Sequence, residues 1–128
     1  MCGSRTRVLV VDDFEQWREF VCATIQQIPE FDVVGVASDG PEAIDKAAAL
    51  HPDLMLLDIG LPTMNGIEVA RSIRRVSPEC AIVLLTENRS REVIDECFRA
   101  GASGYVVKSS AGDDLISAIN AALRRKPF

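Results

Sequence analysis

The chain has 128 residues, of which 48% are hydrophobic, with a formal net charge of −5 and a pI near 4.8. This length suits one domain with a buried core, and the acidic balance argues against nucleic-acid binding by the chain's own charge. No apolar run approaches the roughly 20 residues that span a bilayer, and the N-terminus lacks the apolar core of a signal peptide. Four cysteines without CxxC spacing favour reduced thiols. We therefore expect a cytoplasmic protein without membrane contact.

The first half of the chain contains two short aliphatic runs, each followed by an amphipathic stretch. Residues 8–11 predict a first strand, and the next stretch predicts a helix that ends before Pro29. Residues 32–37 predict a second strand, and Asp39 with Glu42 predicts the capped start of a second helix. The apolar residues of the first helix are expected on one stripe: Phe14, Trp17, Val21, Ile25 and Ile28.

The same alternation continues to the end of the chain. Five strands that alternate with five helices favour a parallel α/β sheet with helices on both faces and right-handed crossovers. At this length we expect a flavodoxin-like (βα)5 doubly wound parallel sheet with strand order 2-1-3-4-5. The remaining strands are expected at residues 54–57, 81–85 and 104–107, and the remaining helices from Asn65, over residues 90–100 and over residues 110–125.

Three aspartates follow two of the expected strands. Asp12 and Asp13 come directly after the first strand, and Asp58 comes directly after the third. The switch point of the expected strand order lies between these two strands, so the three carboxylates should meet at the carboxyl edge of the sheet. Mg2+, which takes few protein oxygens and keeps several waters, would relieve their repulsion. Helix capping is the alternative role, but three acids exceed what capping needs.

Two more polar residues are expected at the same edge. Thr86 follows the fourth strand, and Lys108 follows the fifth. Taken singly, each residue type is common at such positions for structural reasons. Together, a hydroxyl and an ammonium beside a carboxylate–metal cluster can contact a phosphoryl group, whose transfer depends on positioning and charge neutralisation. Asp58 is then a candidate nucleophile that would form an aspartyl phosphate.

These residues belong to a specific set of ordered motifs. The motifs are Asp12-Asp13, Asp58-Ile-Gly-Leu-Pro62 with Asn65-Gly66, Thr86, and Gly101-Ala-Ser-Gly-Tyr-Val-Val-Lys108-Ser-Ser. With them the sequence resembles the receiver domain of two-component response regulators, here expected over residues 5–126. The second and last motifs are most similar to the NarL/FixJ-type (LuxR-class) subfamily, in which a receiver usually precedes a helix-turn-helix DNA-binding domain. Because the chain stops at Phe128, we expect an excised domain or a stand-alone regulator that acts by protein–protein interaction.

The resemblance implies a role for each site residue. Asp58 would accept the phosphoryl group from the phosphohistidine of a sensor histidine kinase. Lys108 would pair with the phosphoryl oxygens, or with Asp58 before phosphorylation. Thr86 would turn inward to hydrogen-bond the phosphoryl group, and Tyr105 would change its exposure with it. The implied ligands of Mg2+ are Asp13, Asp58, the backbone carbonyl of Gly60 and, through water, Asp12.

The implied function is that of a signalling phosphoacceptor, which catalyses only its own phosphorylation and dephosphorylation. Phosphorylation would switch an output, in this subfamily transcription regulation through a DNA-binding domain absent from this chain, and would favour a homodimer. Two positions depart from the family pattern. Glu87 follows Thr86 where most members carry a small residue, which leaves the phosphorylation rate open. Ser109 follows Lys108 where many members have proline, which leaves the geometry of that peptide open.

Two other protein classes also use the end of a first strand to handle phosphate. A haloacid-dehalogenase-like phosphatase has a strand-end aspartate and Mg2+, but it requires an Asp-x-Asp signature that Asp12-Asp13-Phe14 lacks. A flavodoxin-like FMN carrier requires a hydroxyl- and glycine-rich phosphate loop there. The acidic run from Asp12 to Glu15 would repel that phosphate, so both classes are disfavoured.

Overall fold

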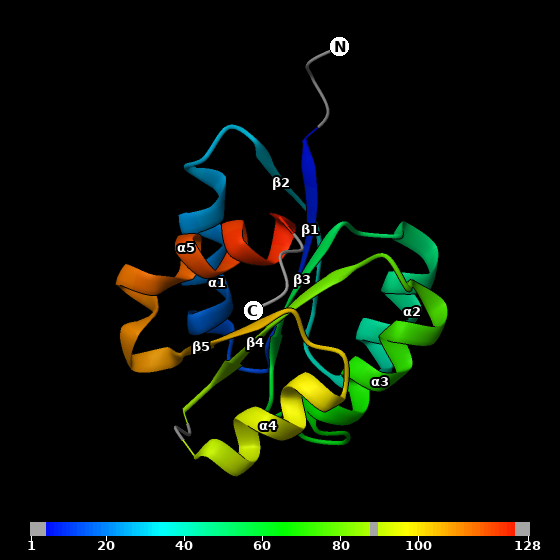
Figure 1. Ribbon diagram of the computed structural model, residues 1–128. Coiled ribbons are helices and arrows are strands. Elements are labelled where there is room, and N and C mark those ends of the chain that lie inside the picture. The colour runs from blue at the N-terminus through cyan, green and yellow to red at the C-terminus, as the bar shows by residue number, and fades with distance from the viewer. Residues whose placement is uncertain (1–4, 88–89, 125–128) are drawn as a thin grey trace.

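A five-stranded parallel sheet forms the centre of the computed structural model, which describes residues 5–87 and 90–124 (Figure 1). The strand order is β2-β1-β3-β4-β5, which confirms the flavodoxin-like prediction. No helix in these two ranges is long and apolar enough to cross a membrane. The elements are β1 (Thr6–Val11), α1 (Glu15–Gln26), β2 (Phe31–Ala37), α2 (Gly40–Leu50), β3 (Leu54–Asp58), α3 (Gly66–Val76), β4 (Ala81–Thr86), α4 (Arg91–Arg99), β5 (Gly104–Val107), the 3-10 turn η1 (Lys108–Ser110) and α5 (Ala111–Arg124).

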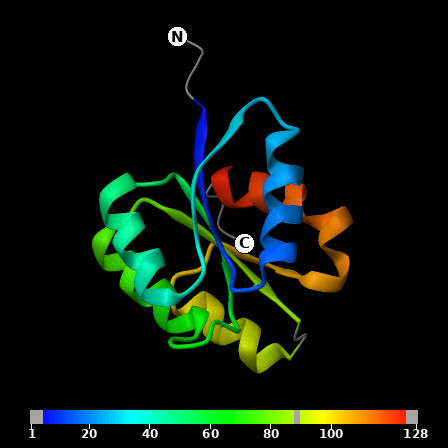
Figure 2. The same ribbon diagram turned by 180° about the vertical axis from the view of Figure 1, so that it is seen from behind.

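The central strands bury side chains on both of their faces. Helices α1 and α5 cover one face, while α2, α3 and α4 cover the other, as Figure 2 shows from behind. In β3, Met55 belongs to the core beneath α2, α3 and α4, whereas Leu56 belongs to the core beneath α1 and α5. This alternation explains why the strands are continuous aliphatic runs in the sequence. Each fully buried aliphatic side chain stabilises the fold by about 1.5–3 kcal/mol.

Two helix starts have the predicted capping residues. The Asp39 carboxylate accepts a hydrogen bond from the backbone N–H of Glu42 at 2.8 Å at the start of α2. The Asn65 side chain likewise accepts from the N–H of Glu68 at 2.9 Å at the start of α3. In α2, however, the Glu42 carboxylate accepts from the N–H of Ser38 at 2.9 Å, one residue before the cap. In a capping box the glutamate would accept from the backbone N–H of the cap residue Asp39. Here it accepts from the N–H of the preceding residue, Ser38.

The sequence-based prediction was wrong at the first residue of the α1 stripe. Phe14 is the N-cap of α1 and is 58% exposed, whereas Val21 and Ile25 are fully buried. The backbone of Phe14 is extended (φ −95°, ψ 107°), so its side chain does not follow the periodicity of the helix.

The end of the chain also differs in detail from the prediction. Strand β5 ends at Val107, as predicted, but Lys108 begins the 3-10 turn η1, which was not predicted. Helix α5 therefore begins at Ala111, one residue later than expected, and the predicted end at residue 125 lies outside the described residues. The turn places Lys108 directly after the carboxyl end of β5, so its position at the edge of the sheet is retained.

Candidate functional site

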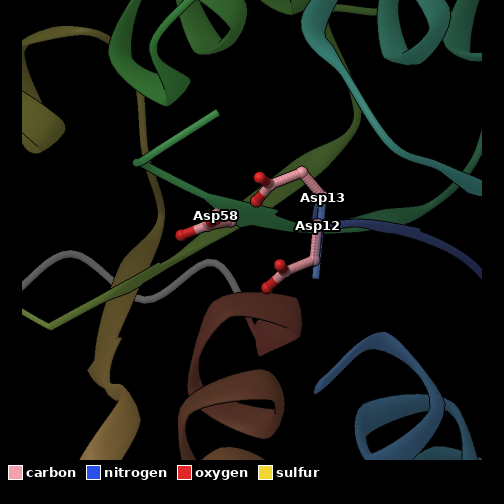
Figure 3. Close-up of side chains that lie close together, drawn as sticks. All are labelled: Asp12, Asp13 and Asp58. Carbon is pink, nitrogen blue, oxygen red and sulfur yellow. The ribbon is translucent and has the colours of Figure 1, made fainter. Parts of the chain in front are cut away.

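Three aspartates meet at the carboxyl edge of the sheet. Asp12 and Asp13 follow the last residue of β1, and Asp58 is the last residue of β3. Because β1 and β3 are hydrogen-bonded neighbours, Asp12 and Asp13 extend on either side of Asp58 (Figure 3). One carboxylate oxygen from each residue lies within 4.8 Å of the others, so the predicted acidic cluster is formed. Oxygen ligands at this spacing could hold a hard divalent cation.

The ionised form of Asp58 is unfavourable in this cluster. Only 7% of the residue is exposed. Burial raises the pKa of its carboxyl group, and the neighbouring Asp12 carboxylate raises it further. Lys108 and the N–H of Gly60, which donates to Oδ1 at 3.2 Å, oppose this pKa shift without cancelling it. A cation at this edge would therefore favour the ionised form of Asp58.

Asp12 is fully buried, and both of its carboxylate oxygens are engaged. Oδ1 accepts from the backbone N–H of Phe14 at 2.9 Å, and Oδ2 accepts from Lys108 Nζ at 3.0 Å. Arg18 donates to the backbone carbonyl of Asp12 at 2.9 Å. By contrast, Asp13 is exposed. The two neighbouring aspartates thus differ in how freely their carboxylates can take a new ligand.

Lys108 lies between two carboxylates. Its Nζ is 3.0 Å from Asp12 Oδ2 and 3.4 Å from Asp58 Oδ1, and its side chain is 14% exposed. Burial acts to lower the pKa of Lys108, but the Asp12 and Asp58 carboxylates outweigh it and raise the pKa above its usual value. Lys108 therefore stays an ammonium group. The sequence predicted a contact with Asp58, and the shorter contact with Asp12 was not foreseen.

Thr86 and Tyr105 lie at different depths along their strands. Thr86 is the last residue of β4, is 4% exposed, and lies one residue beyond the strand partner of Asp58. Tyr105 lies within β5 opposite Leu84 and is 37% exposed. Its ring meets that of Phe98 on α4 edge to face, with centroids 6.1 Å apart. Thr86 therefore belongs to the edge with the aspartates, while Tyr105 faces α4.

The two departures from the expected pattern are resolved in different ways. Glu87 is exposed directly after Thr86. No peptide bond between described residues is cis, so the bond between Lys108 and Ser109 is trans. The geometry of this peptide, which the sequence left open, is therefore the ordinary one, and the exposed Glu87 adds a carboxylate next to Thr86.

Two contributors to the site were missed at the sequence level. A Cβ at Gly66 would lie 2.6 Å from the carbonyl oxygen of Asp58, so only glycine lets α3 begin this close to the strand end. The ring of Trp17 lies with its centroid 5.2 Å from Lys108 Nζ. The Asn65-Gly66 pair was available as a signal for the first. For Trp17 the only signal was its place one helical turn after Asp13.

Comparisons with known proteins identify relatives of the whole described fold. The profile of the response regulator receiver domain matches residues 8–120. The nitrate/nitrite response regulator protein NarL of Escherichia coli (strain K12) is 36% identical over 115 residues, covering 90% of this chain and 53% of that protein. The DNA-binding transcriptional activator DevR/DosR of Mycobacterium tuberculosis is 39% identical over 113 residues, covering 88% and 52%. The chain spans about half the length of the curated relatives it matches.

Solved structures agree with this result. A two-component response regulator of the LuxR family from Aurantimonas sp. SI85-9A1 superposes with a TM-score of 0.91 at 36% identity, covering 96% of this chain and 88% of that one. The receiver domain of the response regulator NarL from Mycobacterium tuberculosis gives a TM-score of 0.90 at 27% identity, covering 97% and 100%. Both likenesses extend over nearly the whole chain.

Proposed function

The chain belongs to the response regulator receiver domain family, and from this premise we propose that Asp58 is its phosphoacceptor and that a sensor histidine kinase is its phosphodonor. Receivers are signalling domains that bind Mg2+ in general, and response regulators are phosphorylated by sensor histidine kinases. The observation that carries the proposal is the position of Asp58. It is a buried carboxylate at the switch point of the sheet, beside Asp12 and 3.4 Å from the Lys108 ammonium.

The donor set supports a magnesium site formed by Asp13, Asp58 and the backbone carbonyl of Gly60. All the available side-chain ligands are carboxylates within 4.8 Å of one another, and such hard oxygens suit Mg2+. The oxygens of Asp12 already accept from Phe14 and Lys108, which supports an indirect role through water. When bound, the ion supplies positive charge for the transferred phosphoryl oxygens.

Asp58, Lys108 and Thr86 would then each have a separate role in phosphoryl transfer. A carboxylate oxygen of Asp58 attacks the phosphorus atom, the bond from phosphorus to the histidine nitrogen breaks, and the leaving imidazole takes up a proton. Lys108 turns from the Asp58 carboxylate to a phosphoryl oxygen, and the buried Thr86 hydroxyl hydrogen-bonds another. The domain thereby catalyses only its own phosphorylation and, with water as nucleophile, its dephosphorylation.

We propose that the response spreads from Thr86 to Tyr105 and α4. The Tyr105 ring is partly exposed and meets Phe98 of α4, so a movement of either residue would change the surface formed by α4 and β5. Several relatives are named as transcriptional regulators. We infer that a receiver over residues 5–126 controls transcription through an attached DNA-binding region, with a phosphorylation-dependent homodimer as the active form.

The test of the proposed function compares two aspartates at opposite ends of β3. Protein is incubated with Mg2+ and a small phosphodonor, or with beryllofluoride, and the bound group is quantified by mass spectrometry or fluorine NMR. Asp58→Asn should abolish incorporation. The matched control is Asp53→Asn, which changes an exposed carboxylate immediately before β3 and should leave incorporation unchanged. Equal incorporation by the Asp58→Asn variant would contradict the assignment.

A further inference from the structure

The indole ring of Trp17 lies next to the Lys108 ammonium, which also contacts two carboxylates. Trp17 lies on the first turn of α1, and its ring centroid is 5.2 Å from Lys108 Nζ. The same nitrogen contacts Asp12 Oδ2 at 3.0 Å and Asp58 Oδ1 at 3.4 Å. Lys108 thus contacts two anionic groups and one aromatic ring, which come from the loop after β1, from β3 and from α1.

The geometry is that of a cation–π interaction. An ammonium within about 6 Å of a ring centroid is attracted by the electron-rich face, and indole gives the strongest attraction of the aromatic side chains. The Lys108 side chain is only 14% exposed, so little water competes with the ring. Phe20 packs beside the indole at a centroid distance of 5.1 Å with the rings tilted by 38°.

Packing alone does not explain a tryptophan at this position. The Nε1 of Trp17 is buried and has no hydrogen-bond partner among the described residues. A buried N–H without a partner is unfavourable, and phenylalanine would place a ring at this site without that penalty. What tryptophan adds is the stronger attraction of its ring for the nearby ammonium.

We propose that Trp17 is a positioning residue for phosphoryl transfer, which holds the Lys108 ammonium in place next to Asp58. This inference rests on the proposed function, in which Lys108 must leave its carboxylate partners and meet a phosphoryl oxygen. The long lysine side chain has many rotamers, and the ring restricts them to those that keep Nζ at the edge of the sheet. Removing the ring should therefore slow phosphorylation without removing a metal ligand.

The kinetic test compares Trp17→Leu, Trp17→Phe and the control Phe20→Leu at saturating Mg2+ with a small phosphodonor. Trp17→Leu should slow phosphorylation by about three- to tenfold, the range that a partly desolvated cation–π contact supports. Trp17→Phe should fall between Trp17→Leu and the parent. Phe20→Leu, which removes the neighbouring ring but not the one over Lys108, should match the parent. A Trp17→Leu variant that matches the parent rate overturns the inference.

The same substitution in a Lys108→Met variant distinguishes an effect on the position of Lys108 from a general effect on the fold. In Lys108→Met protein, the slow residual phosphorylation no longer uses the ammonium. Adding Trp17→Leu to that background should then leave the rate unchanged, because the ring has no cation to hold. If Trp17→Leu slows both backgrounds by the same factor, the ring acts independently of Lys108 and the inference is wrong.

A direct geometric readout needs no phosphorylation. Lysine occurs only at positions 46, 108 and 126, so protein labelled with 13C at the lysine ε-carbons gives few NMR signals. The ε-protons of Lys108 should lie upfield of those of Lys46 because of the ring current, and Trp17→Leu should remove this difference. Lys108 protons at the Lys46 position in the parent overturn the inference even if Asp58 is phosphorylated. Conversely, an upfield signal together with unaltered phosphorylation of Asp58→Asn would reject the proposed function but not the contact.

Discussion

Strand β3 has an aspartate at each end, and the two residues have opposite surroundings. Asp53, just before the strand, is exposed, and its carboxylate accepts from the backbone N–H of Arg7 at 2.9 Å. Asp58, at the other end, is 7% exposed and faces the carboxylate of Asp12. The pKa of Asp58 is raised, first by burial and then by Asp12. At the amino edge, the Asp53 carboxylate thus makes a hydrogen bond to the backbone of β1. At the carboxyl edge, the surroundings of Asp58 disfavour the ionised form of its carboxyl group.

The cationic side chains at the two edges also differ, because one contacts backbone carbonyls and the other contacts carboxylates. Arg7, at the amino edge, donates its Nη1 to the backbone carbonyls of Leu50 and His51 and so fixes the end of α2. Lys108, at the carboxyl edge, is shared between the carboxylates of Asp12 and Asp58. One lysine cannot neutralise three aspartates, so this edge retains negative charge that a metal ion can compensate. Clusters of charged groups with shifted pKa values are typical of functional sites.

The largest expected effect concerns the metal affinity of the two edges. Asp13→Ala should weaken Mg2+ binding by about tenfold or more, because the site has few protein ligands to lose. Asp53→Ala, at the opposite edge, should leave the affinity unchanged. The measurement is a Mg2+ titration followed by the fluorescence of Trp17, the single tryptophan of the chain.

Thr86→Ala sharpens this measurement because it lies at the same edge but supplies no proposed ligand. It should keep the Mg2+ affinity of the parent while blunting the conformational response to phosphorylation. A Thr86→Ala protein that loses Mg2+ as badly as Asp13→Ala would show that the roles assigned to these residues are wrong.

A smaller effect is expected on stability without metal. The raised folded-state pKa of Asp58 means that its contribution to stability is fully present below the unfolded value near 3.8 and is lost as the pH rises through the folded value. At neutral pH the ionised Asp58 therefore destabilises the metal-free fold. Asp58→Asn should raise the free energy of unfolding at pH 7 by about 1 kcal/mol, a usual scale for single-site changes.

The control for this prediction is Asp53→Asn, which should give no such gain because Asp53 is exposed and accepts a hydrogen bond from Arg7. The measurement is urea unfolding with and without Mg2+ between pH 4 and pH 7 (about the range over which carboxylates ionise). The advantage of Asp58→Asn should shrink as the pH falls and when Mg2+ is added. An equal gain in the free energy of unfolding for Asp58→Asn and Asp53→Asn would mean that the two edges do not differ in how they destabilise a carboxylate.

The smallest expected effect concerns Glu87, which adds negative charge next to the carboxyl edge. If this exposed carboxylate repels an anionic phosphodonor, Glu87→Ala should speed phosphorylation by small donors several-fold at low salt. The gain should fall at higher salt, because the Debye length shrinks from about 30 Å at 0.01 M to about 10 Å at 0.1 M. Mg2+ affinity should stay the same. Identical rates at low salt would leave Glu87 with no role in donor access.

Much of the site could be predicted because its residues lie at strand ends. The aliphatic runs before Asp12, Asp58 and Thr86 locate those ends, and the strand order then brings the residues to one edge. Errors arose where the backbone leaves regular structure. Phe14 was assigned to a helical stripe although it precedes the helix. The 3-10 turn that begins at Lys108 was not predicted, so α5 was expected to begin one residue too early.

The contacts of side chains between elements could not be predicted from the sequence. The choice of Lys108 between Asp12 and Asp58 depends on rotamers that no periodicity encodes. The approach of Trp17 to Lys108 depends on how α1 packs beside the turn after β5. Both contacts depend on tertiary packing, which the sequence pattern constrains only through the order of the strands.

The most direct test of the account is to locate the phosphoryl group on the chain. Protein phosphorylated with a small donor and Mg2+ is treated with borohydride, which reduces an aspartyl phosphate to homoserine, and its peptides are sequenced by mass spectrometry. If Asp58 is the phosphoacceptor, homoserine is expected at position 58 and unmodified aspartate at positions 12, 13 and 53. Homoserine at any of those three positions, with Asp58 intact, would show that another carboxylate accepts the phosphoryl group.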